Sequence, residues 1–212
     1  MREILKATLA SLALWAAAAP MAPAAAQARP PAGPAQNWGS VFVVGYTGIG
    51  AFNNPVGTDA LNQNETWNLG SGVGLGVSAA HVLGQALQIG AEATFAPSIG
   101  AEITDPGVAG TTSGHAKVGT AFATGRLMTG GGGGLGFFLQ GGVGAVYWGM
   151  PAPATTATDF AYRYGGGIEY QTSMRRAIFL QWGQIGAFHK HHGVSSNTVK
   201  FSQITGGIRI GL

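Results

Sequence analysis

The chain has 212 residues, of which 46% are hydrophobic, only 9% are charged and 37 are glycine. Ordinary soluble domains carry about 25% charged residues, so a water-exposed surface made from this sequence would lack the charges that prevent aggregation. The 11 basic and 8 acidic residues form no basic run, so nucleic acid is not an expected partner. The absence of cysteine excludes a disulfide framework and thiolate metal sites.

Residues 1–28 have the features of a secretory signal peptide. Two basic residues precede an apolar run over residues 7–19, and the segment AQA at 26–28 fits the cleavage rule for small residues. The apolar run is shorter than the ~20 residues that cross a bilayer as a helix. We therefore expect export, a Pro-rich lead over residues 29–37 and one domain over residues 38–212.

The rest of the chain shows an apolar period of two and almost no helical spacing, which predicts strands. The predicted strands cover residues 38–52, 66–82, 86–96, 116–128, 135–148, 159–171, 177–185 and 198–212. Long polar connections alternate with short turns between them. This alternation predicts an antiparallel meander, with an even strand number and both termini at the end of the short turns.

The strands have one bulky apolar edge and one edge of small or polar residues. In WNLGSGVGLGV, residues 67–77, the odd positions are mostly Trp, Leu and Val, and the even positions from 70 to 76 are all Gly. A phosphate-binding glycine loop would be followed directly by a helix, and no helical spacing follows here. We predict no cofactor site.

Two architectures share this alternation and differ in which edge faces outward. A secreted lipocalin-like barrel turns the apolar edge inward, whereas a membrane barrel turns it toward lipid. A water-facing edge would be rich in Lys, Glu and Asp, but the polar edge here is mostly Gly, Ala, Gln and Ser. We therefore predict an eight-stranded antiparallel outer-membrane β-barrel, in which small residues make room for lumen side chains such as Arg163, Gln140 and Trp148.

The segment at residues 159–186 resembles small outer-membrane proteins of the opacity and OmpA-like type. Their penultimate hairpin carries a G-x-G-x-E-Y stretch, which Gly165, Gly167, Glu169 and Tyr170 fill here. The closing segment NTVKFSQITGGIRIGL is similar to their last strand. These proteins usually end in an aromatic residue, whereas this chain ends in Leu212.

Five charged residues are predicted to face the lumen: Glu92, Arg126, Arg163, Glu169 and Arg209. Isolated charges are costly in a packed interior, so they should pair with one another. A plug of salt bridges is the favoured interpretation because an eight-stranded bore is only wide enough for side chains. A narrow ion path lined by charges is the alternative.

The last long connection contains a His-rich tract with His189, His191 and His192. Such tracts can bind zinc, copper or nickel, but a solvated loop tip has the same composition. The neighbouring Ser195 and Ser196 raise the alternative of a lipid A deacylase, which uses a serine beside a histidine. The spacing from His192 does not match the H-x-S-N motif of those enzymes, so we do not predict an enzyme.

Seven aromatic residues are candidates for interfacial girdles: Trp38, Trp67, Tyr147, Trp148, Tyr162, Tyr164 and Tyr170. The resemblance implies a small non-porin barrel whose exposed loops make surface contacts. The expected partners are outer-membrane lipid, the barrel-assembly machinery and ligands on host or other extracellular surfaces. A lipid-modifying enzyme and a narrow channel are the alternative functions.

Overall fold

The computed structural model describes residues 36–48, 51–58, 64–84, 86–104, 111–129, 134–149, 156–191 and 194–212. The predicted signal peptide and all but the last two residues of the predicted Pro-rich lead lie outside these ranges. Among the described residues, no helix is long and apolar enough to span a bilayer.

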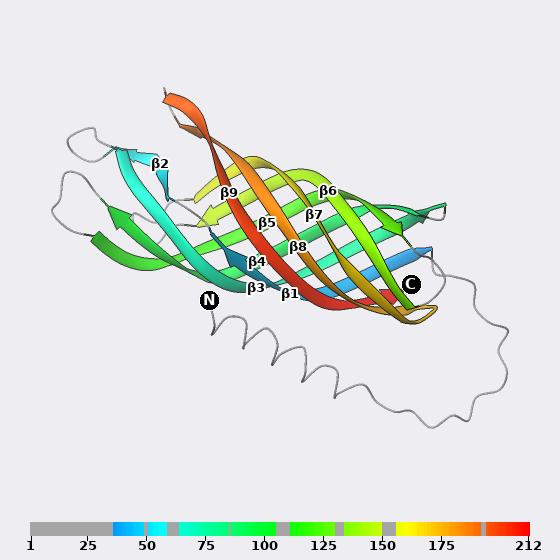
Figure 1. Ribbon diagram of the computed structural model, residues 1–212. Coiled ribbons are helices and arrows are strands. Elements are labelled where there is room, and N and C mark those ends of the chain that lie inside the picture. Colours follow the sequence, from blue (N-terminus) through cyan, green and yellow to red (C-terminus); the bar gives the residue numbers. More distant parts are fainter. Residues whose placement is uncertain are drawn as a thin grey trace, which may run out of the picture.

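The described residues form a single antiparallel sheet that curls into a barrel (Figure 1). Its strands are β1 (Asn37–Thr47), β2 (Ala51–Thr58), β3 (Asn64–Leu83), β4 (Leu87–Thr104), β5 (Thr111–Thr129), β6 (Gly134–Gly149), β7 (Thr156–Ser173), β8 (Arg176–His191) and β9 (Val194–Gly211).

Eight of these strands close the ring, because β1 pairs with β9 on one side and with β3 on the other. The remaining strand, β2, follows a break at Gly48, whose φ of 68° suits glycine. It pairs only with the first residues of β3 and also contacts β8. The predicted eight-stranded antiparallel barrel is therefore confirmed, with β2 as an addition outside the ring.

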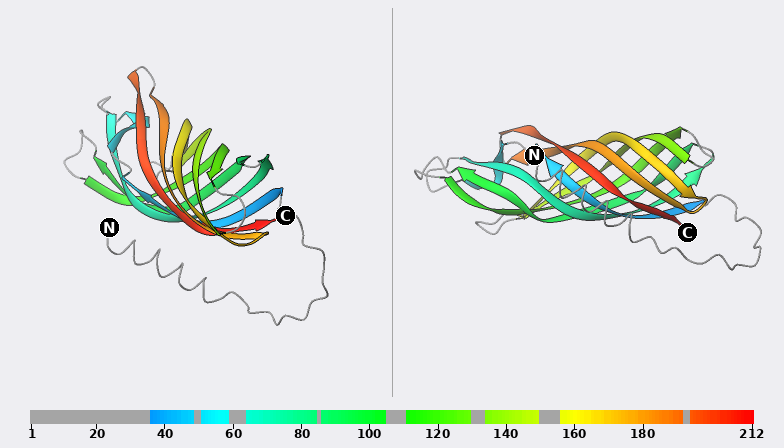
Figure 2. Two further views of the ribbon diagram at one scale, coloured as in Figure 1. Left: turned by 45° about the vertical axis from the view of Figure 1, so that its right-hand side comes forward. Right: turned by 60° about the horizontal axis from the view of Figure 1, so that its bottom comes forward.

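The two ends of the barrel differ. One end, called the turn end, carries the short connections after β3, β5 and β7, together with the start of β1 and the end of β9 (Figures 1 and 2). The other end, called the loop end, carries the connections after β1, β4, β6 and β8. This arrangement has both termini of the barrel domain at the turn end, as the sequence predicts.

The strands are longer at the loop end than the sequence predicts. β4 continues to Thr104, β5 begins at Thr111 and β8 continues to His191, so much of the predicted loops 97–115 and 186–197 is strand. The first predicted strand is too long, because β1 ends at Thr47. In the added segments the outward positions include Glu102 and His115, so the apolar alternation that marks a strand is absent there.

The bulky apolar rows point outward. On β6 they run from Leu135, 61% exposed, to Tyr147, 39% exposed. The twelve residue steps between them correspond to a height of about 28 Å at ~3.3 Å per residue and a tilt of ~45°, close to the ~25 Å apolar band of outer-membrane barrels. A lipocalin-like barrel would have buried these rows, so that alternative is excluded. Other outward residues of this apolar band are Val73, Leu75, Val77, Ile89, Phe95, Leu139, Phe160, Ile168, Ile178, Leu180, Trp182, Ile204 and Ile210.

Leu69, which alternation alone places on the outer surface, lies in the lumen instead. Leu69 is 1% exposed, because register shifts between β3 and β4 reverse the alternation at the loop end of β3. Trp38 and Trp148 are buried, so they are not girdle residues. For Trp148 this confirms the other expectation, that its side chain lies in the lumen. Tyr147, Tyr164 and Tyr170 do point outward, and the side chain of Trp67 lies outside the described part of the chain.

The lumen glycines allow close approach of backbone as well as of side chains. A Cβ atom at Gly76 would overlap the ring of Phe42, as the sequence analysis expects of small lumen residues. At Gly144, however, a Cβ atom would overlap the backbone carbonyl oxygen of Ala121 on the neighbouring β5. Glycine therefore also lets the strands bend sharply enough to close a narrow barrel.

Candidate functional site: the filled lumen

All five predicted lumen charges are buried inside the barrel, and the structure brings them into two groups. In the first group, Arg163 of β7 forms an ion pair with Glu92 of β4 across the lumen. The other carboxylate oxygen of Glu92 accepts a hydrogen bond from Gln140 Nε2 at 3.3 Å. Both oxygens of this carboxylate are therefore satisfied.

The second group is centred on Glu169. Arg126 Nη2 and Arg209 Nη1 both donate to Glu169 Oε2, each at 2.7 Å. Arg209 Nη2 also donates to Gln88 Oε1 at 2.7 Å. One carboxylate thus serves two arginines that come from β5 and β9, strands on different sides of the ring.

Aromatic rings cover the arginines. The guanidinium carbon of Arg126 lies 3.4 Å from the ring centroid of Phe138, and that of Arg209 lies 5.0 Å from the ring centroid of Trp38. Stacking of a guanidinium on an aromatic face stabilises the cation, more strongly when water is excluded. The charged groups are therefore enclosed by apolar surfaces as well as by their partners.

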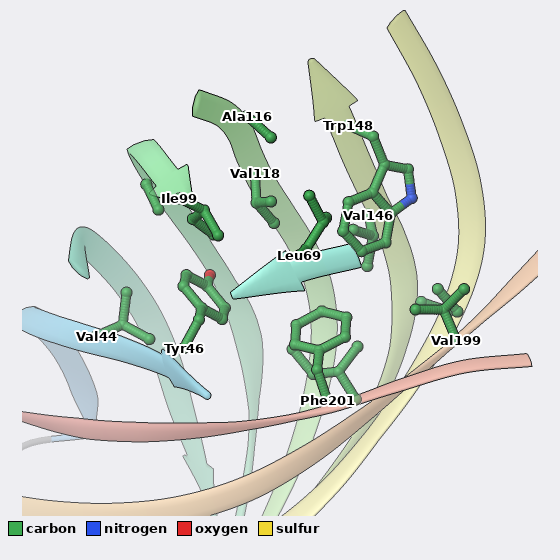
Figure 3. Packing of buried hydrophobic residues seen from close by; sticks show 14 of the residues in the cluster. Val44, Tyr46, Leu69, Ile99, Ala116, Val118, Val146, Trp148, Val199 and Phe201 are labelled. Atoms are coloured by element: carbon green, nitrogen blue, oxygen red, sulfur yellow. The ribbon is translucent and has the colours of Figure 1, made fainter. Parts of the chain in front are cut away.

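The loop-end half of the lumen is apolar (Figure 3). Within it, Trp148 Nε1 donates to Asp159 Oδ2 at 2.7 Å. At its lower edge, Tyr46 hydrogen-bonds with Thr94, which hydrogen-bonds with Thr120 at 2.7 Å. The loop-end apolar cluster consists of Val44, Tyr46, Leu69, Ala96, Ile99, Ala101, Ala116, Val118, Phe122, Val146, Trp148, Ala161, Ile185, Ala187, Val199 and Phe201.

Of this cluster only Trp148 was predicted to lie in the lumen, because bulky apolar residues were otherwise expected at the lipid-facing edge. A signal was present: Val118, Trp148 and Ile185 occupy positions whose parity matches the lumen-facing residues of their own strands. Apolar residues on both faces of a strand segment indicate that both faces are covered.

A small polar cavity lies in the turn-end half of the lumen. Its volume is about 30 Å³, and Ser40, Glu92, Arg126, Gln181 and Arg209 are among the residues that line it. Among the described residues, Arg126 Nε and Gln181 Nε2 have no hydrogen-bond partner. On β9, Gln203 and Thr205 are also buried with side-chain atoms that no described residue satisfies.

The His and Ser candidates are only partly described. His189 and His191 lie in the last residues of β8, opposite Asn197 and Val194 of β9, and His192 lies outside the described residues. Ser195 and Ser196 lie in β9 rather than in a loop, which corrects the expected placement. In the described part of the chain, no three His, Cys, Asp or Glu residues gather as metal ligands. Metal binding by the His-rich tract stays a prediction.

Comparison with known proteins adds evidence about the fold. No protein-family model matches this chain, and no curated protein matches its sequence. The crystal structure of Neisserial surface protein A is similar, with a TM-score of 0.56, 11% identity and coverage of 85% of this chain and 100% of that chain. The outer membrane protein OprG from Pseudomonas aeruginosa is also similar, with a TM-score of 0.54, 10% identity and coverage of 84% and 96%. At such identities the likeness concerns the fold, which is that of a small outer-membrane β-barrel.

Proposed function

We propose that the chain is a non-porin outer-membrane protein that acts through its loop end in surface contacts. The filled lumen is the observation that carries this proposal. The loop-end apolar cluster occupies the loop-end half of the lumen, and the ion pairs of Glu92 and Glu169 occupy the turn-end half. A barrel without an open path has only its ends and its lipid-facing wall available for contact with other molecules.

The outer wall supports an outer-membrane location and membrane lipid as a partner. Its apolar band has about the height of a hydrocarbon layer, with Tyr147 at the loop-end edge and Tyr170 at the turn-end edge. Delivery of such a chain to the membrane requires the barrel-assembly machinery as a second partner. If the turn end, with both termini of the barrel domain, faces the periplasm, the loop end faces the outside of the cell. Ligands of host or other extracellular surfaces would bind there.

The finer assignment to the opacity and OmpA-like type has support in the G-x-G-x-E-Y stretch. A Cβ atom at Gly165 or Gly167 would overlap backbone carbonyl oxygens of β8, and Glu169 is the acceptor shared by two arginines. The two glycines therefore let neighbouring strands approach closely, and Glu169 helps to fill the lumen. The stretch supports a role in the barrel rather than in an enzymatic site.

Conductance in planar lipid bilayers tests the closed lumen. The wild-type barrel should show no steady conductance above that of the bare bilayer. A stable ohmic conductance that changes with Arg163→Ala would contradict the plug and favour the narrow channel. Glu102→Gln, at an exposed residue of β4, is the matched control for a charge change outside the lumen.

Loop replacement tests the surface role. Replacing the connections 105–110 and 150–155 with short Gly-Asn turns should reduce attachment of expressing cells to a monolayer of host cells. The same replacement at 130–133, which is at the turn end, should leave attachment unchanged. Equal attachment of all three strains, at a level above cells without the barrel, would contradict a role for these loops.

The absence of enzymatic activity is proposed as well. Mass spectra of lipid A from cells with and without the chain should be identical. Loss of an acyl chain that depends on Ser195 or Ser196 would instead establish the lipid-modifying alternative.

A further inference from the structure

The turn-end half of the lumen contains more buried positive than negative charge. Among the described residues, Arg126, Arg163 and Arg209 are matched there by two carboxylates, Glu92 and Glu169. The third lumen carboxylate among the described residues, Asp159, lies four residues before Arg163 on β7, which is ~13 Å along the strand. It accepts the hydrogen bond of Trp148 at the loop end. A buried charge without a partner is strongly unfavourable, so the excess needs compensation.

The polar cavity lies at this excess charge. It is lined by Arg126 and Arg209, the two arginines that share one oxygen of Glu169. The acidic lining residue Glu92 already accepts hydrogen bonds from Arg163 and Gln140 through its two oxygens. The electrostatic environment of the cavity is therefore dominated by the arginines.

The unsatisfied groups of the cavity wall are donors. Arg126 Nε and Gln181 Nε2 are buried N–H groups with no acceptor in the described part of the chain, and both residues line the cavity. The Phe138 ring stabilises the Arg126 cation from its face, but it cannot accept the in-plane Nε–H bond in the way an anion can. Unpaired donors beside excess positive charge are the features of an anion site.

From these three features we propose that the cavity binds one small monovalent anion of the halide class, between Arg126, Arg209 and Gln181. A cavity of about 30 Å³ exceeds the ~10–15 Å³ that one water molecule needs, so it has room for a chloride or bromide ion. The anion completes the charge balance of the plug. This role is separate from the surface contacts, and a closed lumen does not depend on it.

Bromide is the probe for the structural test. Crystals grown in sodium bromide, with data collected at the bromine absorption edge, should show one anomalous peak inside the lumen beside Arg126 and Gln181. Peaks confined to the outer surface, or no peak, would overturn the proposal.

A measurement of thermal stability is the second test of the anion site, and it does not require crystals. At equal ionic strength, raising chloride from 1 to 300 mM in place of gluconate should raise the unfolding midpoint of the detergent-solubilised barrel saturably, by on the order of 5 °C. Gln181→Glu supplies a carboxylate in place of the anion, so it should remove both the chloride effect and the bromide peak.

Gln36→Glu is the matched control, because it makes the same chemical change at an exposed residue. It should keep the chloride effect and the bromide peak. An equal chloride effect in wild type and Gln181→Glu would overturn the proposal. If Gln181→Glu does not fold, the wild-type bromide peak decides alone.

Discussion

Replacing Glu169 with glutamine is expected to lower the free energy of unfolding by about 3–5 kcal/mol, the usual cost of removing one partner of a buried ion pair. The change keeps the shape of the side chain but leaves Arg126 and Arg209 without the carboxylate that both of them bind at 2.7 Å. The free energy can be measured by denaturant unfolding in lipid vesicles, followed by tryptophan fluorescence.

The control for this variant is Glu102→Gln. Glu102 is an exposed residue of β4, and neutralising it should change the free energy of unfolding by no more than ~0.5 kcal/mol. If Glu169→Gln were as stable as Glu102→Gln, the lumen ion pairs would not hold the barrel together. The plug would then be a filling without energetic importance.

Gly144→Ala is expected to destabilise the barrel by about 1–3 kcal/mol, although alanine is the smallest possible addition. The new methyl group would overlap the carbonyl oxygen of Ala121, and backbone of a paired strand cannot move aside without breaking the ladder. The same unfolding measurement applies. The effect comes from backbone geometry, so it should not be rescued by shortening a lumen side chain.

Gly125→Ala is the matched control for Gly144→Ala. A Cβ atom at Gly125 meets nothing within 4 Å, and the residue points outward. Alanine there should be neutral, or should stabilise by a few tenths of a kcal/mol, because it restricts the unfolded chain. Equal stability of the two variants would contradict the close approach of β5 and β6 at Gly144.

The fold was predictable where apolar and polar side chains alternate along a whole strand. On β7 the outward apolar row from Phe160 to Tyr170 is interrupted only at Gly166, so both faces could be assigned from the sequence. The lumen positions of Arg163 and Glu169 followed from that alternation. Their partners did not, because pairing across a barrel depends on strand tilt and register, which a single sequence does not specify.

The predicted faces were wrong where a register shift reverses the alternation of side chains, or where the strand leaves the apolar band and its surroundings change. Register shifts in β3 and β4 reverse the alternation, so Leu69 and Ile99 enter the lumen although their parity suggests the outer surface. At the loop end the lumen is apolar and the outer surface is polar. In the turn-end half the lumen is polar and the outer surface is apolar. Trp148 is both a lumen candidate and a girdle candidate by sequence, and the structure confirms the lumen placement, because its side chain is fully buried.

The most direct test of the membrane-facing surface uses tryptophan quenching by lipids brominated on their acyl chains. Two single-tryptophan variants are compared in vesicles, one that keeps the outward Trp182, which is 49% exposed, and one that keeps the lumen residue Trp148. Trp182 should be strongly quenched and Trp148 should not be. Quenching of Trp148 with Trp182 unaffected would show that the apolar rows do not contact the acyl chains.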